Sequence, residues 1–291
     1  MNILITGTGT MIGNSIANFL HNRGYKLICT YNKNFPKNLK KKNIRILKLD
    51  LKYPKKLKKI NFDIIIHCAA AIPGYSSMKK KEIYKTNVSS FQKILDNSNN
   101  LKKIVLLSTM SIYGEIKKPY VRETDTPNSP DMYGLSKIKM EKDLIKFYKK
   151  NLSLSYLVLR LPGVLGKNGD RNFLCKTLKK IKMNENINIS TPNALFNNCI
   201  HTDVISDIIY KYVSDKNLKL KNSIFNLGSK KPIKFKNVIN RICKNFNYTG
   251  KITFVKSKKK PFLVDISKIK SVYSSLPTTY KCVNEFIISN K

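Results

Sequence analysis

The sequence predicts an α/β protein built on a Rossmann-type, doubly wound parallel sheet. In the first half of the chain, short and almost continuously apolar runs alternate with stretches of helical period. A glycine-rich turn joins the first of these runs to the first helical stretch. Strands that are apolar throughout are buried on both faces, as in a parallel sheet with helices on each side.

Six apolar runs are expected to form strands, and helical stretches lie between most of them. The expected strands are Asn2–Thr6, Lys26–Tyr31, Ile44–Asp50, Phe62–Ala70, Lys103–Thr109 and Ser155–Leu161. The expected helices are Met11–Arg23, Lys79–Ser98 and Asp131–Lys150. After Gly166 short elements mix with turn clusters. We therefore expect an NAD(P)-binding domain at residues 1–165 and a smaller C-terminal region at 166–291, mainly substrate-binding, with some segments returning to the first domain.

The composition bears on partners and location. The 291 residues carry 56 Lys and Arg against 17 Asp and Glu, a formal net charge of +39. A nucleic-acid partner is one explanation, but arginines are few and the lysines are spread along the whole chain, which favours a lysine-rich proteome instead. No apolar run approaches the about 20 residues that cross a bilayer, and the N-terminus has the pattern of a strand rather than an export signal. We expect a cytoplasmic protein with no nucleic-acid or membrane partner.

Cysteine and histidine spacing predicts no metal site. The three histidines are scattered, and no two of the six cysteines are close enough in sequence to form a metal-ligand pair. Most cysteines lie in apolar runs, so we expect buried free thiols.

The turn after the first strand contains Gly7, Gly9 and Gly13. Such a turn lets backbone N–H groups approach a pyrophosphate at the positive N-terminus of the next helix. The second strand ends in "CTYNKN", which lacks the acidic residue that binds the ribose in NAD-preferring proteins, whereas Lys33 could meet a 2′-phosphate. We therefore expect NADP as the cofactor, with NAD as the alternative.

Tyr133 and Lys137 lie four residues apart in a stretch that begins a helix, so they share one helix face. A phenol with an ordinary pKa of about 10 is a poor base at neutral pH. A nearby ammonium favours the phenolate, so this pair is a candidate acid/base.

Ordered motifs along most of the chain resemble the extended short-chain dehydrogenase/reductase family, which comprises sugar-nucleotide epimerases, dehydratases and reductases. The motifs are TGTGTMIG at residues 6–13, DIIIHCAAA at 63–71, YKTNV at 84–88, LLSTMSIYG at 106–114 and YGLSK at 133–137, followed by LRLPGVLG, CIHTDV and FNLGS. The first motif departs from the family's TGxxGxxG, because Thr10 stands where the middle glycine belongs.

The resemblance implies roles for individual residues. Tyr133 would be the acid/base on a sugar hydroxyl or carbonyl, and Lys137 would also hold the nicotinamide ribose. Thr109 would hydrogen-bond the reacting oxygen, with Ser108 as its rival. Cofactor binding is implied for Gly7, Thr10, Met11, Ile12, Asn32, Lys33, Asp50, Leu51, Ala69, Ala70, Ala71, Asn87, Ser108, Tyr133, Lys137, Pro162 and Val164. Substrate binding is implied for Thr109, Ser111, Tyr133, Gly163 and Lys260.

The resemblance also bears on the reaction. The family's dehydratases have an Asp-Glu pair directly after the threonine, where this chain has Met110 and Ser111, which argues against a 4,6-dehydratase. Keto-reduction or 4-epimerisation of a nucleotide-activated sugar remains, and the missing acidic residue after the second strand tilts the expectation towards reduction. Substrate-side departures are Gly163 in place of an asparagine, Asn197 and Asn198 where an arginine is common, and Lys260 in place of an arginine. Family members often form homodimers.

Two alternatives stay open. A non-catalytic NADP-binding regulator of the same fold would show no hydride exchange with any sugar nucleotide. A nucleic-acid binder would show steeply salt-dependent DNA affinity.

Overall fold

The computed structural model describes residues 1–50, 53, 60–74, 78–98, 101–255 and 260–291. Leu51, expected to contact the cofactor, lies outside the described residues. The chain forms two compact units. Unit 1 comprises residues 1–115, 126–160 and 206–224, and unit 2 comprises residues 116–125, 161–205 and 225–291.

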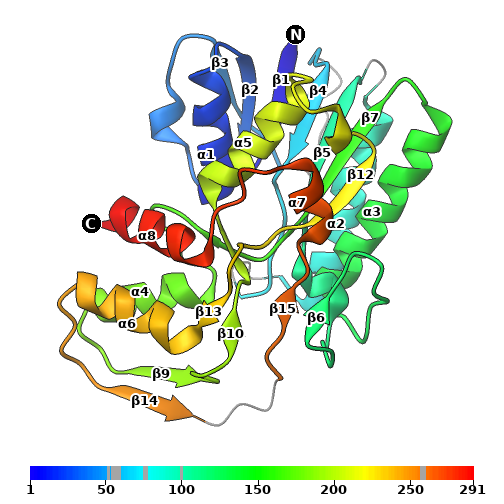
Figure 1. The fold of residues 1–291 in the computed structure, drawn as a ribbon. Helices are drawn as coiled ribbons and strands as arrows, with labels where there is room; N and C mark the ends of the chain where they lie inside the picture. Colours follow the sequence, from blue (N-terminus) through cyan, green and yellow to red (C-terminus); the bar gives the residue numbers. More distant parts are fainter. Residues whose placement is uncertain (51–52, 54–59, 75–77, 99–100, 256–259) are drawn as a thin grey trace. The chain divides into compact units, whose positions relative to one another are not determined.

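A seven-stranded sheet is the framework of unit 1, with the strand order β12-β7-β5-β4-β1-β2-β3 (Figure 1). Its strands are β1 (Asn2–Thr6), β2 (Lys26–Tyr31), β3 (Ile44–Lys48), β4 (Ile64–His67), β5 (Lys103–Thr109), β7 (Ser155–Leu161) and β12 (Ser223–Asn226). The pairings from β3 through β5 are all parallel. The predicted Rossmann-type parallel sheet is confirmed, and β12 is an additional strand contributed from late in the chain.

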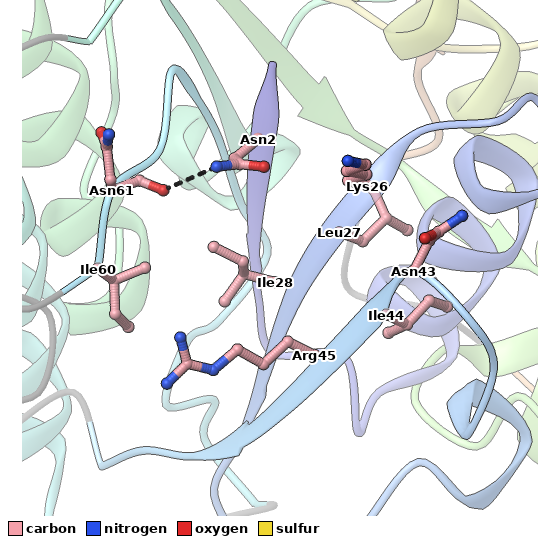
Figure 2. A pocket seen from close by; sticks show the side chains of 9 residues that line it. All are labelled: Asn2, Lys26, Leu27, Ile28, Asn43, Ile44, Arg45, Ile60 and Asn61. Atoms are coloured by element: carbon pink, nitrogen blue, oxygen red, sulfur yellow. Dashed lines mark hydrogen bonds between the residues drawn. The ribbon is translucent and has the colours of Figure 1, made fainter.

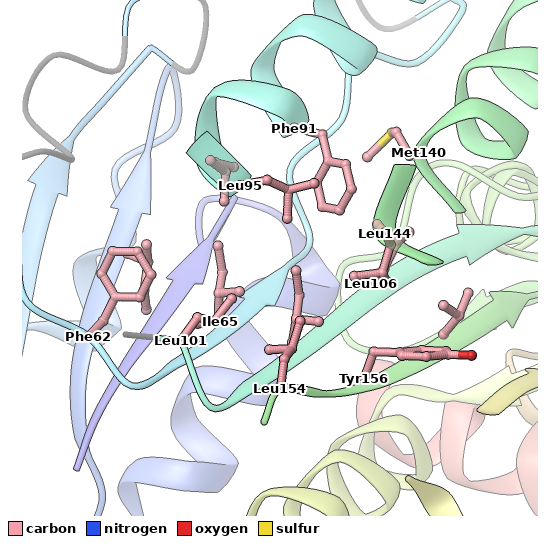
Figure 3. Close-up of a cluster of buried hydrophobic side chains, with 14 of the residues drawn as sticks. Phe62, Ile65, Phe91, Leu95, Leu101, Leu106, Met140, Leu144, Leu154 and Tyr156 are labelled. Atoms are coloured by element: carbon pink, nitrogen blue, oxygen red, sulfur yellow. The ribbon is translucent and has the colours of Figure 1, made fainter. Parts of the chain in front are cut away.

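Helices of unit 1 pack against both faces of this sheet. On one face α2 (Lys80–Asp96) and α3 (Met132–Lys150) lie side by side. Figure 3 shows the apolar cluster beneath them, in which Phe91 and Met140 meet alternate residues of the strands, such as Ile65 and Leu106. Successive strand residues point to opposite faces, so the intervening buried residues face the other side.

The opposite helix pair is α1 (Met11–His21) and α5 (Thr202–Val213). Phe19 of α1 meets Tyr210 of α5 edge to face, with 6.2 Å between ring centroids. Every central strand is apolar because helices cover both faces of the sheet.

Unit 2 is built from short strand pairs and helices. The pairs are β6 (Tyr120–Val121) with β15 (Leu263–Val264), β8 (Gly163–Leu165) with β11 (Cys199–His201), β9 (Ile187–Ser190) with β14 (Ile252–Val255), and β10 (Leu195–Phe196) with β13 (Ile233–Lys234). The helices are α4 (Phe173–Lys182), α6 (Phe235–Asn245), α7 (Ser267–Val272) and α8 (Thr279–Asn290).

Short 3-10 turns complete the described chain: η1 (Lys37–Leu39), η3 (Met110–Tyr113) and η4 (Leu218–Leu220). All six cysteines are free thiols, of which five are buried and Cys68 is half-buried. Within the described part of the chain, no helix combines the length and the apolar character needed to cross a membrane.

Candidate active site

The glycine turn follows β1 at the carboxyl end of the sheet. Gly7 has a φ of +73°, and a Cβ built on it would lie 2.8 Å from the Cα of Ala69. A Cβ on Gly9 would lie 2.1 Å from the carbonyl oxygen of Asn34. The chain therefore needs glycine at both positions, because backbone from the ends of β4 and β2 passes directly over the turn.

Thr10, which replaces the family's middle glycine, caps helix α1. Its hydroxyl donates to the carbonyl oxygen of Gly7 at 2.8 Å and accepts from the N–H of Gly13 at 3.3 Å. The first-turn N–H groups of Met11 and Ile12 precede any intrahelical acceptor, so they remain open to an anion at the positive end of the helix. This turn fits the pyrophosphate of a dinucleotide, and the departure at Thr10 leaves the helix N-terminus intact.

The segment after β4 is held by buried polar side chains. The hydroxyl of Thr6 accepts from the N–H groups of Cys68 and Ala69, both at 3.2 Å. Asn87 of α2 accepts from the N–H of Ala71 at 2.7 Å and donates to its carbonyl oxygen at 3.0 Å. Ala69 and Ala71, expected to line the cofactor, thus have fixed backbones and half-buried side chains.

Asn87 itself is buried, and its amide also donates to the hydroxyl of Ser136 at 3.1 Å. Its side chain is therefore committed to the chain's own groups. We infer that any influence on a cofactor passes through Ala71.

Helix α3 approaches the end of β5 very closely. It begins after Asp131, whose carboxylate accepts from the N–H of Gly134 at 2.8 Å. A Cβ on Gly134 would lie 2.3 Å from the carbonyl oxygen of Ser111 in η3. The glycine behind Tyr133 is thus required for the helix to reach the segment that carries Thr109.

Lys137 is a buried polar residue of this contact. Its side chain is only 2% exposed, and its ammonium donates to the carbonyl oxygen of Leu107 at 2.8 Å. The Nζ atom lies 6.0 Å from the ring centroid of the half-buried Tyr133. Burial lowers the pKa of Lys137 to about 8, against the opposing influence of Cys68 and Glu141.

Ser108 and Thr109, adjacent on β5, point in different directions. The hydroxyl of Ser108 is buried and donates to the carboxylate of Glu141. Any contact of Ser108 with a dinucleotide is therefore left to its backbone. Thr109 is half-buried; its hydroxyl accepts from the N–H of Ser111 at 3.2 Å and donates to the Ser111 hydroxyl at 3.3 Å. Of the two, Thr109 is the one with a side chain accessible to a substrate.

The remaining predicted cofactor residues of unit 1 follow β2 and β3. Asn32, Lys33 and Asp50 are exposed and lie beyond the carboxyl ends of these strands. The parallel sheet therefore brings them to the same edge as the glycine turn, the segment after β4 and Thr109.

A hollow of about 510 Å³ lies at the opposite, amino ends of β1, β2 and β3 (Figure 2). Asn2, Lys26 and Arg45 are among its lining residues, and the amide of Asn2 donates to the carbonyl oxygen of Asn61 at 3.4 Å. None of the predicted site residues in the described part of the chain lines it, so we do not assign the active site there.

Unit 2 has its own pocket of about 360 Å³, which contains two of the predicted residues, Gly163 and Lys260. Its walls include the rings of Phe173, Phe196 and Phe235, whose centroids lie 5.1 to 5.7 Å apart in successive pairs. An apolar pocket with a few polar groups is typical of a site for a small organic ligand. Pro162 is half-buried and Val164 is buried within β8, and neither lines this pocket.

The sequence did not reveal which buried amide and charged side chains surround the sheet edge of unit 1 and the pocket of unit 2. Asn197, in the segment where the family often has arginine, donates to the carbonyl oxygen of Val264 at 2.8 Å and accepts from its N–H at 2.9 Å. It secures the strand that follows Lys260 instead of facing a ligand. Glu141 and Arg160 form a buried ion pair behind Lys137, and the spacing of Glu141, four residues after Lys137, was the available signal.

The model of the NAD dependent epimerase/dehydratase family matches residues 3–228 of this chain. Among curated proteins, UDP-glucose 4-epimerase of Halalkalibacterium halodurans is 28% identical over 173 residues, which cover 57% of this chain and 52% of that protein. Other curated 4-epimerases of plants and bacteria are matched over 25% to 33% of their own length. The chain thus covers only part of these relatives.

Solved structures match over almost the whole chain. UDP-glucose 4-epimerase of Thermotoga maritima, crystallised with UDP-glucose, superposes with a TM-score of 0.85 at 21% identity and covers 99% of this chain and 98% of that one. UDP-glucuronic acid 4-epimerase of Bacillus cereus, in complex with NAD, gives a TM-score of 0.83 at 20% identity, covering 100% and 95%. At this identity the likeness establishes the fold.

Replacing Gly134 by alanine tests the close approach of α3. The added Cβ would meet the Ser111 carbonyl oxygen, so we expect Gly134→Ala to lower the free energy of unfolding by about 1–3 kcal/mol. Alanine is otherwise the better helix former by about 1 kcal/mol, so the opposite sign is expected if the contact is absent. Chemical denaturation measures this, with the exposed Leu135→Ala as control.

His67 makes stability depend on pH. Burial, with a smaller effect of Lys137, lowers its pKa to about 3 from 6.5. Between these values the unfolded chain binds a proton that the folded chain does not, so stability falls as the pH falls through this window. The slope is up to about 1.4 kcal/mol per pH unit.

We therefore expect His67→Asn to flatten the decline of unfolding free energy between pH 6.5 and 4, whatever its effect at neutral pH. His21→Asn, at the half-buried histidine that ends α1, is the matched control. Equal slopes in wild type and His67→Asn would contradict the assignment.

Proposed function

The chain belongs to the NAD dependent epimerase/dehydratase family, and we propose that it is an NAD(P)-dependent enzyme that acts on a nucleotide-activated sugar, with 4-epimerisation as the reaction. The observation that carries this proposal is the helix face of α3, where a buried lysine stands beside Tyr133 and the end of β5. The glycine turn lies two strands away at the same edge of the sheet.

In this proposal the cofactor is held by unit 1. The open N–H groups of Met11 and Ile12 would bind the pyrophosphate, and the fixed backbone of Ala69–Ala71 would border the dinucleotide. The bound nicotinamide supplies the site that accepts and returns a hydride. Lys137 would hold the nicotinamide ribose through the face of its ammonium that Leu107 does not use.

Tyr133 would take the proton from a sugar hydroxyl and return it. The buried ammonium of Lys137 favours the phenolate form of its neighbour, which makes the phenol a base near neutral pH. Thr109 would donate or accept a hydrogen bond at the same sugar oxygen. Its hydroxyl is already oriented by the N–H of Ser111.

Epimerisation is favoured over the other reactions of the family. Met110 and Ser111 cannot shuttle the proton that a 4,6-dehydratase removes with its acidic pair. Several relatives are named as 4-epimerases of UDP-sugars. Keto-reduction is the second candidate, and the absence of a carboxylate after β2 favours it because NADPH usually serves net reduction.

The pocket of unit 2 would receive the nucleotide part of the substrate. The aromatic walls of Phe196 and Phe235 suit a planar base, and the exposed Lys260 at the rim would supply one positive charge to a phosphate. Lys260 stands where the family often has arginine, so it would act as a point charge without a bidentate fork. The amide of Asn197, at another position where arginine is common, is bonded to Val264.

Tyr133→Phe tests the reaction. We expect the variant to bind the dinucleotide and to unfold like the wild type, but to lose at least about 100-fold in kcat, since a positioned acid/base contributes about 10²–10⁴-fold. Turnover is measured with a panel of UDP-sugars by following the appearance of the 4-epimer, and consumption of NADPH would identify keto-reduction. Wild-type turnover by Tyr133→Phe would reject the assignment.

Lys33→Glu tests cofactor preference. If Lys33 meets the 2′-phosphate of NADP, the variant should bind NADP at least about tenfold more weakly, which corresponds to about 1.4 kcal/mol, and should bind NAD no less tightly. Lys26→Glu is the matched control, because Lys26 is an exposed lysine at the opposite end of the same strand. An equal loss in both variants would indicate a general effect of charge.

A further inference from the structure

Helix α3 carries a third polar residue on the same face as Tyr133 and Lys137. Glu141 follows Lys137 by four residues, so Tyr133, Lys137 and Glu141 lie along one face of the helix. Among the described residues Glu141 is the one acidic side chain in the buried class, although the chain carries 17 acidic residues in all. A buried carboxylate is costly unless it is fully bonded.

The carboxylate of Glu141 is fully engaged. Its Oε1 accepts from the hydroxyl of Ser108 and, at 3.2 Å, from Nε of Arg160, while Oε2 accepts from Nη2 of Arg160 at 2.8 Å. Arg160 in turn donates through Nη1 to the hydroxyl of Tyr113 at 2.7 Å. This network fixes the anion on the side of Lys137 that faces away from Tyr133.

Two successive turns of α3 thereby hold two successive residues of β5. Lys137 binds the carbonyl oxygen of Leu107, and Glu141 binds the hydroxyl of Ser108. The next residue of the strand is Thr109. Glu141 therefore holds the strand residue that precedes Thr109 and lies one helical turn from Lys137.

The charged and titratable groups that face Lys137 are Cys68 and His67 at the end of β4, and Tyr133 and Glu141 on its own helix. Burial raises the pKa of Cys68 to about 12, so the thiol is uncharged where Lys137 titrates. The pKa of His67, lowered to about 3, leaves that ring neutral too. Glu141 is the anion that remains in this group.

We propose that Glu141 is a positioning residue that keeps the buried Lys137 ammonium charged, and so supports the phenolate of Tyr133 without touching substrate. The proposal deepens the proposed function and rests on it for its catalytic meaning. The charge state of Lys137 can nevertheless be measured without any turnover.

The test is the titration of Lys137 by NMR in the full-length protein with 13C-labelled lysine, its Hε–Cε signal being assigned by its absence in Lys137→Met. Burial lowers the pKa of Lys137 to about 8, so we expect its midpoint to be separated from those of ordinary lysines near 10.4. We expect Glu141→Gln to move this midpoint down by about one pH unit. Asp143→Asn is the matched control, because Asp143 lies on the same helix but bonds Lys139; it should leave the midpoint in place.

An unchanged midpoint in Glu141→Gln, or an equal shift in Asp143→Asn, would overturn the proposal. Because Glu141→Gln removes the carboxylate that pairs with the buried Arg160, the double variant Glu141→Gln/Arg160→Gln is measured as well. It removes both charges, and we expect a downward shift that is smaller than in Glu141→Gln, because removal of the positive guanidinium by itself raises the pKa of Lys137. A return to the wild-type midpoint in the double variant would show that Arg160, and not the lost carboxylate, had moved Lys137.

The activity readout is the pH profile of kcat. If activity needs the charged form of Lys137, kcat declines at alkaline pH as Lys137 loses its proton. Glu141→Gln should therefore shift this alkaline decline of kcat to lower pH by about one pH unit, as in the NMR titration, with KM nearly unchanged. An unshifted alkaline decline in an active variant would contradict the role. If the wild type turns over no sugar nucleotide, the proposed function fails, whereas the NMR titration still decides whether Glu141 sets the charge of Lys137.

Discussion

The seating of helix α3 on the carboxyl end of β5 is the constraint on which the rest of the site depends. A side chain at Gly134 would collide with the Ser111 carbonyl oxygen, so the helix can sit this close only with glycine there. The close seating lets Lys137 cross to the carbonyl oxygen of Leu107. Without that acceptor the ammonium would be buried unbonded, at a cost of several kcal/mol. The close backbone contact at Gly134 is therefore a condition for the electrostatic effect of Lys137 on Tyr133.

At Lys137, burial lowers the pKa and nearby negative charge raises it. The balance between the two decides whether the ammonium can favour the phenolate of Tyr133. Desolvation destabilises the charged ammonium form of Lys137 and lowers its pKa to about 8, close to neutral pH. Were burial unopposed, the lysine would be neutral at physiological pH and would not favour a phenolate. The bonded carboxylate of Glu141 acts in the opposite direction. A chain with a formal charge of +39 places its one described buried acid at this position.

The strands and helices of the sheet could be predicted from the sequence because each has a local signal, either an apolar run or a helical period. The six expected strands and three helices of unit 1 lie where apolar runs and helical period place them, within a few residues at their ends. Two kinds of feature escaped prediction. β12 joins the sheet from residues 223–226, a long-range pairing with no local signal. The partners of Asn87, Ser108 and Glu141 are fixed by packing between elements, so spacing alone could not reveal which polar groups turn inward.

The departures from the family pattern share a physical consequence. Thr10 replaces a glycine, and Asn197 lies where an arginine is common; both side chains bond backbone of this chain. The hydroxyl of Thr10 satisfies a first-turn N–H of α1 and so orders the turn before any ligand arrives. The amide of Asn197 pairs with Val264 as a neighbouring strand would. Both side chains therefore order backbone of this chain. If the pocket of unit 2 receives the substrate as proposed, Lys260 would supply the positive charge for a phosphate as a single ammonium, so recognition there would depend more on pocket shape than on bidentate ionic contacts.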